Sequence, residues 1–268
     1  MTLKLAIAGA AGRMGRELAR LVHASESCVL AGGLEAPSSP HLGTDYGELI
    51  GVGKLGVAIS GDAASVIAGV DGIIDFTVPA ATLALVKKTS AQRKIHIIGT
   101  TGIDRAGDDV IAEAAKSATI VKTGNFSFGV NLLAALVKRA ARTLGEDFDI
   151  EILEMHHRMK IDAPSGTALL LGKSAAEGRE ISLKEKSVRV RDGHTGPRQS
   201  GDIGFASLRG GTVVGDHTVL FAGSGERLEL RHVAESRELF ARGAVKAAVW
   251  AKGKKPGLYS MMDVLDLE

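Results

Sequence analysis

The chain has 268 residues, and its 33 Lys and Arg residues nearly balance its 31 Asp and Glu residues. This near-neutral balance excludes a nucleic-acid partner held by bulk charge, and the 4% aromatic content disfavours a stacking platform for single strands. The single cysteine, Cys28, provides neither a disulfide framework nor a thiolate metal site, which is typical of the reducing cytoplasm. Because there is no apolar run of membrane-spanning length and no signal-peptide pattern, we expect a soluble cytoplasmic protein without a membrane partner.

The first half of the sequence predicts buried strands that alternate with helices. An apolar run over residues 3–8 ends at glycines, and residues 13–25 continue with apolar side chains at helical spacing. Further strands are expected at residues 28–34, 70–76, 95–98 and 119–121, and helices at 66–68, 80–92 and 108–117. Asp62 or Ser65 would cap the first of these helices, and Pro79 suits the first turn of the second. This alternation predicts an α/β fold with a parallel sheet covered on both faces.

After Asn125-Phe126-Ser127 the pattern changes, and we place a domain boundary near residue 127. Helices are expected at residues 131–144 and 167–176, and strands at residues 150–155, 187–191, 204–209, 212–214, 217–221 and 227–232. Glycine turns at Gly210-Gly211 and Gly223-Ser224-Gly225 favour an antiparallel or mixed sheet. A closing helix over residues 236–252 is compatible with either domain.

A glycine-rich turn, Gly9-Ala10-Ala11-Gly12-Arg13-Met14-Gly15, joins the first strand to the first helix. Dinucleotide binding needs such a turn, because the backbone must approach a pyrophosphate at a helix N-terminus. Glu35 lies 20 residues after Gly15, at the end of the second strand, where a carboxylate can accept hydrogen bonds from ribose hydroxyls. The alternatives are a glycine turn that binds nothing and a solvated loop carboxylate.

A second candidate cofactor loop, Gly99-Thr100-Thr101-Gly102, follows another predicted strand. Ligands of parallel sheets lie at the carboxyl ends of the strands, so this loop is placed to contact the nicotinamide ribose or amide through its backbone. An ordinary turn before the next helix explains the same residues.

The segment with the most chemistry is EMHHRMKIDAPSGTA, over residues 154–168. Two adjacent histidines, His156 and His157, leave a strand, while Arg158 and Lys160 add positive charge. Ser165-Gly166-Thr167 begins a helix, where free N–H groups favour an anion, so the segment suits a carboxylate substrate. Alternatives are a basic surface loop and a structural or metal-binding histidine pair. The spacing is poor for zinc, and we expect no metal.

These strings together resemble the bacterial dihydrodipicolinate reductases, enzymes of diaminopimelate and lysine biosynthesis that act on 4-hydroxy-tetrahydrodipicolinate. The resemblance rests on GxxGRMG, GTTG, NFS, the 154–168 segment, GHTGPR, IGFASLRGG and the closing MMDVLDL, so it covers nearly the whole chain. It implies a Rossmann-type dinucleotide-binding domain from residues 1–127 and 237–268. It also implies an α+β substrate-binding and oligomerisation domain with a mixed sheet at residues 128–236, in a homotetramer formed through these sheets.

The resemblance also implies roles for individual residues. His156 would be the acid/base residue and Lys160 the proton donor in a reduction by NADH or NADPH. The substrate carboxylates would be held by His157, Lys160, Gly166 and Thr167. The cofactor would be held by Gly9, Ala10, Ala11, Gly12, Arg13, Met14, Glu35, Gly99, Thr100, Thr101, Thr123, Gly124, Asn125 and Phe126.

One departure from the family concerns the choice of cofactor. Ala36 follows Glu35, where the family often has a basic residue for the 2′-phosphate of NADPH, and Arg16 is a partial substitute. Two other functions remain open. A dehydrogenase working through a thioacyl intermediate needs a catalytic cysteine, and Cys28 lies in an apolar strand, which is a poor setting. A dinucleotide-sensing regulatory module would not need His156 beside Lys160.

Overall fold

The structure, a computed structural model, describes residues 2–267. It divides into two compact units, one of residues 2–126 with Glu238–Asp266 and one of Ser127–Arg237 with Leu267. The closing helix α9, whose domain the sequence leaves open, belongs to the first unit.

The first unit is a seven-stranded parallel sheet in the order β12-β6-β5-β4-β1-β2-β3. Its strands are β1 (Leu3–Ala8), β2 (Cys28–Leu34), β3 (Ile59–Ser60), β4 (Gly72–Asp75), β5 (Ile95–Ile98), β6 (Thr119–Lys122) and β12 (Gly257–Tyr259). Its helices are α1 (Arg13–His23), α2 (Tyr46–Ile50), α3 (Ala63–Ala68), α4 (Pro79–Ala91), α5 (Arg105–Ala114), α9 (Glu238–Ala251) and α10 (Met261–Leu265). The α/β fold with a parallel sheet is confirmed.

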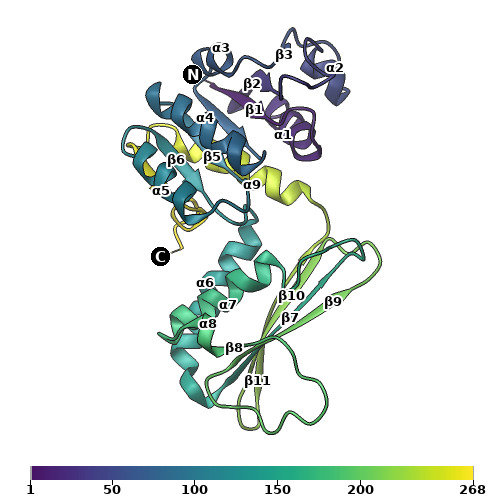
Figure 1. Cartoon of the computed structure of the whole chain (residues 1–268), viewed down its shortest axis with the longest axis vertical. Coiled ribbons are helices and arrows are strands. Elements are labelled where there is room, and N and C mark those ends of the chain that lie inside the picture. Colours follow the sequence, from purple (N-terminus) through teal and green to yellow (C-terminus); the bar gives the residue numbers. More distant parts are fainter. Residues whose placement is uncertain (1, 268) are drawn as a thin grey trace. The chain divides into compact units, whose positions relative to one another are not determined.

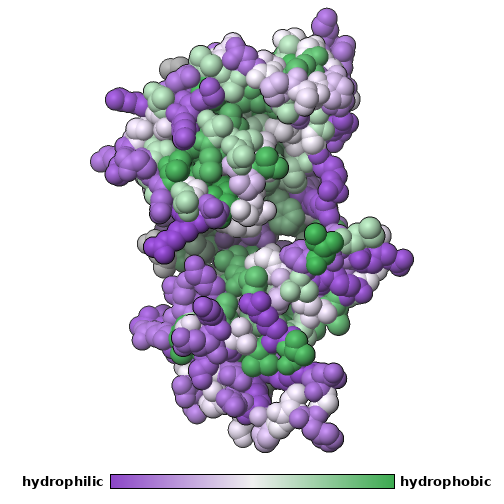
Figure 2. Space-filling view, viewed as in Figure 1, coloured by the Kyte–Doolittle hydropathy of each residue, from purple (hydrophilic) through white to green (hydrophobic). Residues whose placement is uncertain are grey.

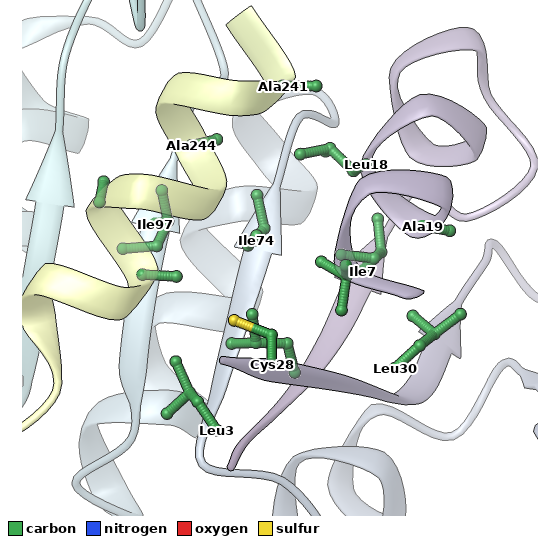
Figure 3. Packing of buried hydrophobic residues seen from close by; sticks show 14 of the residues in the cluster. Leu3, Ile7, Leu18, Ala19, Cys28, Leu30, Ile74, Ile97, Ala241 and Ala244 are labelled. Carbon is green, nitrogen blue, oxygen red and sulfur yellow. The ribbon is translucent and has the colours of Figure 1, made fainter. Parts of the chain in front are cut away.

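Alternating side chains of the strands cover both faces of this sheet. Leu5 and Ile7 pack against α1 and α9, whereas Ala6 and Ala8 pack on the side of α3 and α4. Figure 1 shows these helices around the sheet. In Figure 3 Ala241 and Ala244 of α9 lie over the strands that carry Ile74 and Ile97, with α1 beside them. Small alanines on α9 let this helix approach the sheet closely.

The sequence placed most helix ends of the first unit within a few residues. Asp62 caps α3 by accepting hydrogen bonds from the N–H groups of Ala64 and Ser65, so Ser65 lies inside the helix instead of capping it. Pro79 is the first residue of α4, as expected.

The second unit is a five-stranded mixed sheet in the order β11-β10-β7-β9-β8, with helices on one face (Figure 1). Its elements are α6 (Phe128–Leu144), η1 (Gly145–Asp147), β7 (Asp149–His156), α7 (Gly166–Gly178), α8 (Leu183–Lys186), β8 (Ser187–Val188), β9 (Ile203–Arg209), β10 (Gly215–Ala222) and β11 (Arg227–Ala234). Strand β7 pairs in antiparallel fashion with β10 and in parallel with β9. The mixed sheet is confirmed.

Three details of the second unit differ from the expectation. The strand expected at residues 187–191 contains only Ser187–Val188, and α6 begins at Phe128 because Ser127 caps it. Residues 212–214 form no strand, because Val213 and Gly211 instead accept hydrogen bonds from the loop after β7. Gly210-Gly211 therefore lies in a crossing connection between β9 and β10, which flank β7, whereas Gly223–Gly225 does turn a hairpin between β10 and β11.

Candidate active site

The glycine turn, residues 9–15, follows the carboxyl end of β1. This strand lies inside the first unit's sheet, between β4 and β2. Gly9 has φ +74°, and a Cβ on Gly15 would lie 2.1 Å from the carbonyl oxygen of Gly9, so this turn requires both glycines. Gly12 begins α1 without a side-chain cap, and the first turn of the helix has no acidic residue. The first N–H groups of α1 therefore suit an anion such as a pyrophosphate.

The side chains of Glu35 and Tyr46 help to hold this turn in place. The N–H of Ala11 donates to Oε1 of Glu35 over 2.7 Å, which ties the turn to the end of β2. The buried hydroxyl of Tyr46 lies 3.1 Å from the carbonyl oxygen of Ala10 and 3.0 Å from that of Gly15. Tyr46 was not predicted from the sequence, because nothing near it marks a contact with a turn 31 to 36 residues away.

A cavity of about 500 Å³ opens beside Glu35. It is lined by the ends of β1 and β2, the segments after β3 and β4, and one side of α4. The wall is mostly apolar; among the described residues that line it, Glu35 is the one acid and Lys88 the one base. An apolar cavity, a carboxylate and an uncapped helix N-terminus fit the adenine, ribose and pyrophosphate of a dinucleotide.

The second candidate cofactor loop, Gly99–Gly102, is anchored by a buried polar network around Thr100. The hydroxyl of Thr82 donates to Oγ1 of Thr100 over 2.7 Å, and the N–H of Thr77 donates to the same oxygen. Asp75 accepts from the N–H and the hydroxyl of Thr77 and pairs with His96 at 3.3 Å. Burial alone would raise the pKa of Asp75, but hydrogen bonds from His96 and Thr77 lower it overall. The side chain of Thr100 thus points into the protein, which leaves backbone groups for a ligand.

The remaining predicted cofactor residues follow β1, β5 and β6 in the first unit. Thr123 donates to the carbonyl oxygen of Asn125, and the ring of Phe126 packs against Phe76 with centroids 5.5 Å apart. Exposed positions are Gly12, Arg13, Thr101 and Gly124, half-buried ones are Gly9, Ala11, Met14, Gly99 and Thr123, and buried ones are Ala10, Asn125 and Phe126. All fourteen predicted cofactor residues lie in the first unit.

His156 is the last residue of β7 in the second unit and is largely buried. Its Nδ1 lies 2.6 Å from Oε2 of Glu154, which is on the same face of the strand two residues earlier. Burial lowers the pKa of His156 below its ordinary value, although Glu154 opposes this effect. His157 lies beyond the end of the strand and contacts Arg237, with 3.2 Å between Nε2 and the guanidinium.

The loop after β7 carries Lys160 and leads to α7. The ammonium of Lys160 donates to Oδ1 of Asp162 over 2.7 Å, so part of its charge is already paired, and Lys160 still lowers the pKa of His156. Ser165 caps α7 by accepting from the N–H of Ala168, while Gly166 is exposed and Thr167 half-buried at the first positions of the helix. The structure therefore brings His156, Lys160 and the α7 N-terminus together in one unit.

Three residues around His156 were not predicted from the sequence: Glu154, Arg209 and His217. Arg209, the last residue of β9, forms two hydrogen bonds with the carboxylate of Glu154. His217 Nε2 lies 3.0 Å from Oγ of Ser165, and burial lowers the pKa of His217 to about 4. Two of these residues could have been found from the sequence, because Glu154 in β7 and His217 in β10 are polar side chains at positions of the strands that otherwise face the core.

Two negative findings concern residues 2–267. Within them, no three His, Cys, Asp or Glu side chains gather in a way that could hold a metal ion. No helix in this part of the chain has the length and apolar character needed to cross a membrane.

Comparisons with known proteins match both halves of the chain. The family model described as "Dihydrodipicolinate reductase, N-terminus" matches residues 3–126, and the one for the C-terminus matches residues 129–265. Relatives named 4-hydroxy-tetrahydrodipicolinate reductase come from Chelativorans sp. (61% identity; 97% of this chain, 95% of the relative) and Brucella abortus (59%; 98% of each).

Solved structures show the same fold at lower identity. A dipicolinate-bound dihydrodipicolinate reductase from Paenisporosarcina sp. matches with a TM-score of 0.77 and 24% identity, covering 98% of this chain and 99% of that one. A myo-inositol dehydrogenase from Lactobacillus casei, in complex with NAD(H) and myo-inositol, matches with a TM-score of 0.59 and 12% identity, covering 100% and 91%.

Proposed function

Because this chain belongs to the dihydrodipicolinate reductase family, we propose that its first unit binds the cofactor and its second unit the substrate. The chain catalyses the NAD(P)H-dependent reduction of 4-hydroxy-tetrahydrodipicolinate to tetrahydrodipicolinate, in diaminopimelate and lysine biosynthesis. The observation that carries the assignment of roles is the buried Glu154–His156 pair beside Lys160 and the N-terminus of α7.

The cofactor is held by residues of the first unit in this proposal. The turn from Gly9 to Met14 receives the pyrophosphate at the start of α1, and Glu35 accepts the ribose hydroxyls. The loops Gly99–Thr101 and Thr123–Phe126 hold the nicotinamide part. The uncapped start of α1 and the mostly apolar cavity beside Glu35 support this placement.

The substrate carboxylates are held by His157, Lys160, Gly166 and Thr167 in the second unit. A helix N-terminus and an ammonium group are the donors that a dicarboxylate requires. The dipicolinate held by the Paenisporosarcina enzyme is a ligand of this class. When substrate binds, Lys160 leaves Asp162 and pairs with a substrate carboxylate. The 2.7 Å ion pair between Lys160 and Asp162 is partly exposed, so breaking it costs little.

When bound, the reduced nicotinamide supplies a hydride to the dehydrated imine form of the substrate. The chain's own task is to neutralise the charge that the substrate gains. His156 and Lys160 are the two groups that can give it a proton, and such transfers are typically worth about 10² to 10⁴ in rate. Lys160 also offsets the negative charge of the carboxylates.

The cavity beside Glu35 decides which cofactor is preferred. The carboxylate of Glu35 accepts ribose hydroxyls but repels a 2′-phosphate, and Ala36 offers no compensating charge. Arg16 donates its Nε–H to the carbonyl oxygen of Ala11, so this side chain supports the turn. Lys88 on α4 is the cation placed on the cavity wall. We expect NADH to be used at least as well as NADPH, with Lys88 responsible for much of the NADPH activity.

The assembly is a homotetramer in the cytoplasm, formed through the sheets of the second units. The face of this sheet opposite α6 and α7 carries Leu153, Leu208 and Val233, which are 37%, 47% and 50% exposed. Hydrophobic residues are visible among hydrophilic ones on the surface of this unit (Figure 2). An open sheet face with apolar side chains supports pairing with a second copy.

The direct test is oxidation of NADH and NADPH in the presence of enzymatically generated 4-hydroxy-tetrahydrodipicolinate. The wild type should oxidise at least one cofactor only when the substrate is present. Substrate-independent oxidation, or none with either cofactor, would contradict the proposed function.

A further inference from the structure

Four hydrogen-bond donors converge on the carboxylate of Glu154. Oε2 lies 2.6 Å from Nδ1 of His156 and 2.8 Å from a guanidinium nitrogen of Arg209. Oε1 lies 2.9 Å from the other guanidinium nitrogen and 3.1 Å from the backbone nitrogen of Ser165. The Arg209 and Ser165 groups can only donate, so both oxygens must accept.

Glu154 is therefore ionised, although its side chain is only 1% exposed. Burial by itself would raise the pKa of Glu154, but the hydrogen bonds from Arg209 and His156 lower it to about 2. Because an ionised carboxylate has no hydrogen to give, the hydrogen in the 2.6 Å contact must belong to Nδ1 of His156.

This fixes the neutral tautomer of His156 and leaves Nε2 as the nitrogen that exchanges protons. A Cβ on Gly215 would lie 3.2 Å from this Nε2, so the glycine keeps the space beside the atom free of a side chain. Arg209 also donates to the carbonyl oxygen of Asp162, which connects the Glu154 pair to the loop that carries Lys160.

We propose that Glu154, held by Arg209, is a positioning residue that presents Nε2 of His156 to the substrate. In the proton-transfer step the Nε2–H bond of the imidazolium breaks, its electron pair stays on nitrogen, and the proton joins the substrate atom that has gained electron density. Neutral His156 keeps its Nδ1–H on Glu154 and regains the Nε2 proton from water. This rests on the proposed function, which supplies the reaction.

The decisive experiment compares the pH dependence of kcat/KM in three variants. Glu154 raises the pKa of His156 and Arg209 lowers it. The alkaline limb of the kcat/KM profile is the fall in rate as His156 loses its proton. Glu154→Gln should therefore move this limb to lower pH, and Arg209→Leu should move it to higher pH. Glu154→Gln should also lower kcat by about 10- to 100-fold, because its NH₂ group faces donors whichever way the amide turns.

Glu151→Gln is the matched control. Glu151 is on the same strand and also binds arginines, Arg191 and Arg198, at 2.8 to 3.1 Å, but it is not next to the histidine. This variant loses an equivalent ion pair and should leave the alkaline limb unchanged. The proposal would be overturned if the alkaline limb of the kcat/KM profile lay at the same pH in Glu154→Gln and Glu151→Gln. It would also be overturned if Glu154→Gln and Arg209→Leu moved this limb in the same direction.

A second measurement does not depend on turnover or on the variants folding. The ¹⁵N chemical shifts of His156 in the wild-type protein should show Nδ1 protonated and Nε2 bare at neutral pH. The opposite tautomer would refute the positioning role even if the enzyme is active. A wild type with the expected tautomer but no substrate-dependent oxidation would instead point to a failure of the proposed function.

Discussion

The backbone N–H of Ala11 donates to Oε1 of Glu35, so the middle of the glycine turn and the end of β2 are joined by a single side chain. Glu35 also accepts from the N–H of Ala36 through Oε2. Each carboxylate oxygen has a second lone pair, so the group can still accept ribose hydroxyls while it is held by the backbone. In the proposed function this carboxylate places a negative charge beside the ribose.

This fixed charge predicts the outcome of adding a cation at the next position. Ala36→Arg should shift the ratio of kcat/KM toward NADPH by roughly 1 to 2 kcal/mol, the scale of one charge-assisted contact. The comparison requires both cofactors in the wild type and the variant. An unchanged ratio would show that residue 36 does not lie beside the 2′ position.

Lys88→Ala should lower kcat/KM for NADPH several-fold and leave NADH nearly unaffected, because Lys88 lines the same cavity as Glu35. Its neighbour Lys87, also exposed but absent from the cavity wall, is the matched control. Equal effects of Lys87→Ala and Lys88→Ala would assign the effect to general charge.

Loss of either proposed proton donor should slow turnover and leave cofactor binding unchanged. His156→Gln and Lys160→Ala should each lower kcat by at least about 10², because they act on proton supply and substrate charge. NADH affinity, followed by its fluorescence, should be nearly unchanged, since both residues lie in the second unit. Near-normal turnover by both variants would remove these roles.

The hydroxyl at the second position of α7 should contribute to binding only. Thr167→Val should raise KM with little change in kcat, since a hydroxyl that donates to a carboxylate does so in substrate and transition state alike. Thr167→Ser keeps the hydroxyl and should restore most of the affinity. A pure loss of kcat in Thr167→Val is the contrary result.

The buried histidine of β10 should make the protein sensitive to acid. His217 has a folded pKa of about 4 against an ordinary 6.5, so the unfolded chain binds its proton first as the pH falls through 6.5. Stability is then lost down to about pH 4. Between pH 7 and pH 4.5 this costs on the order of 2 kcal/mol, and His217→Gln should reduce the fall in unfolding free energy by that amount. Urea denaturation at the two pH values measures it; parallel losses in both proteins would disprove it.

The family resemblance predicts a tetramer, and the open sheet face of the second unit supports association with another copy. Light scattering at micromolar concentration should give four times the mass of one chain, and Leu153→Lys, which puts a charge on the outer face, should weaken the assembly. A stable wild-type monomer would count against the homotetramer.

Local patterns in the sequence were sufficient for most of the fold. Apolar runs predicted β1, β2 and β5 to the residue, because parallel strands are buried on both faces. A glycine ends the run of β1 and that of β5. Strand neighbours in the second unit were not predictable in this way. Nothing local shows that β7 lies between β9 and β10, so Gly210-Gly211 looked like a hairpin turn.

The candidate site was predictable only in part. The motifs around Gly9 and His156 were recognisable from their spacing and residue types. Arg209 was not, because it is 55 residues from its partner Glu154 in the sequence. A partner so distant is chosen by sheet register: β9 pairs with β7 so that Arg209 lies opposite His156. Tyr46 was not predicted for the same reason, since its hydroxyl donates to carbonyl groups 31 and 36 residues away.

The position of α9 has a consequence for synthesis of the chain. The second unit is built almost wholly from one continuous stretch, Ser127–Arg237, whereas the first unit needs Ala241, Ala244 and Ala248 to cover the side of the sheet that holds Ile97. Because synthesis proceeds from the N-terminus, these alanines are made after Ser127–Arg237. The first unit, although most of it is made first, therefore completes its core only after Ser127–Arg237 has emerged, and until then one face of its sheet is without α9.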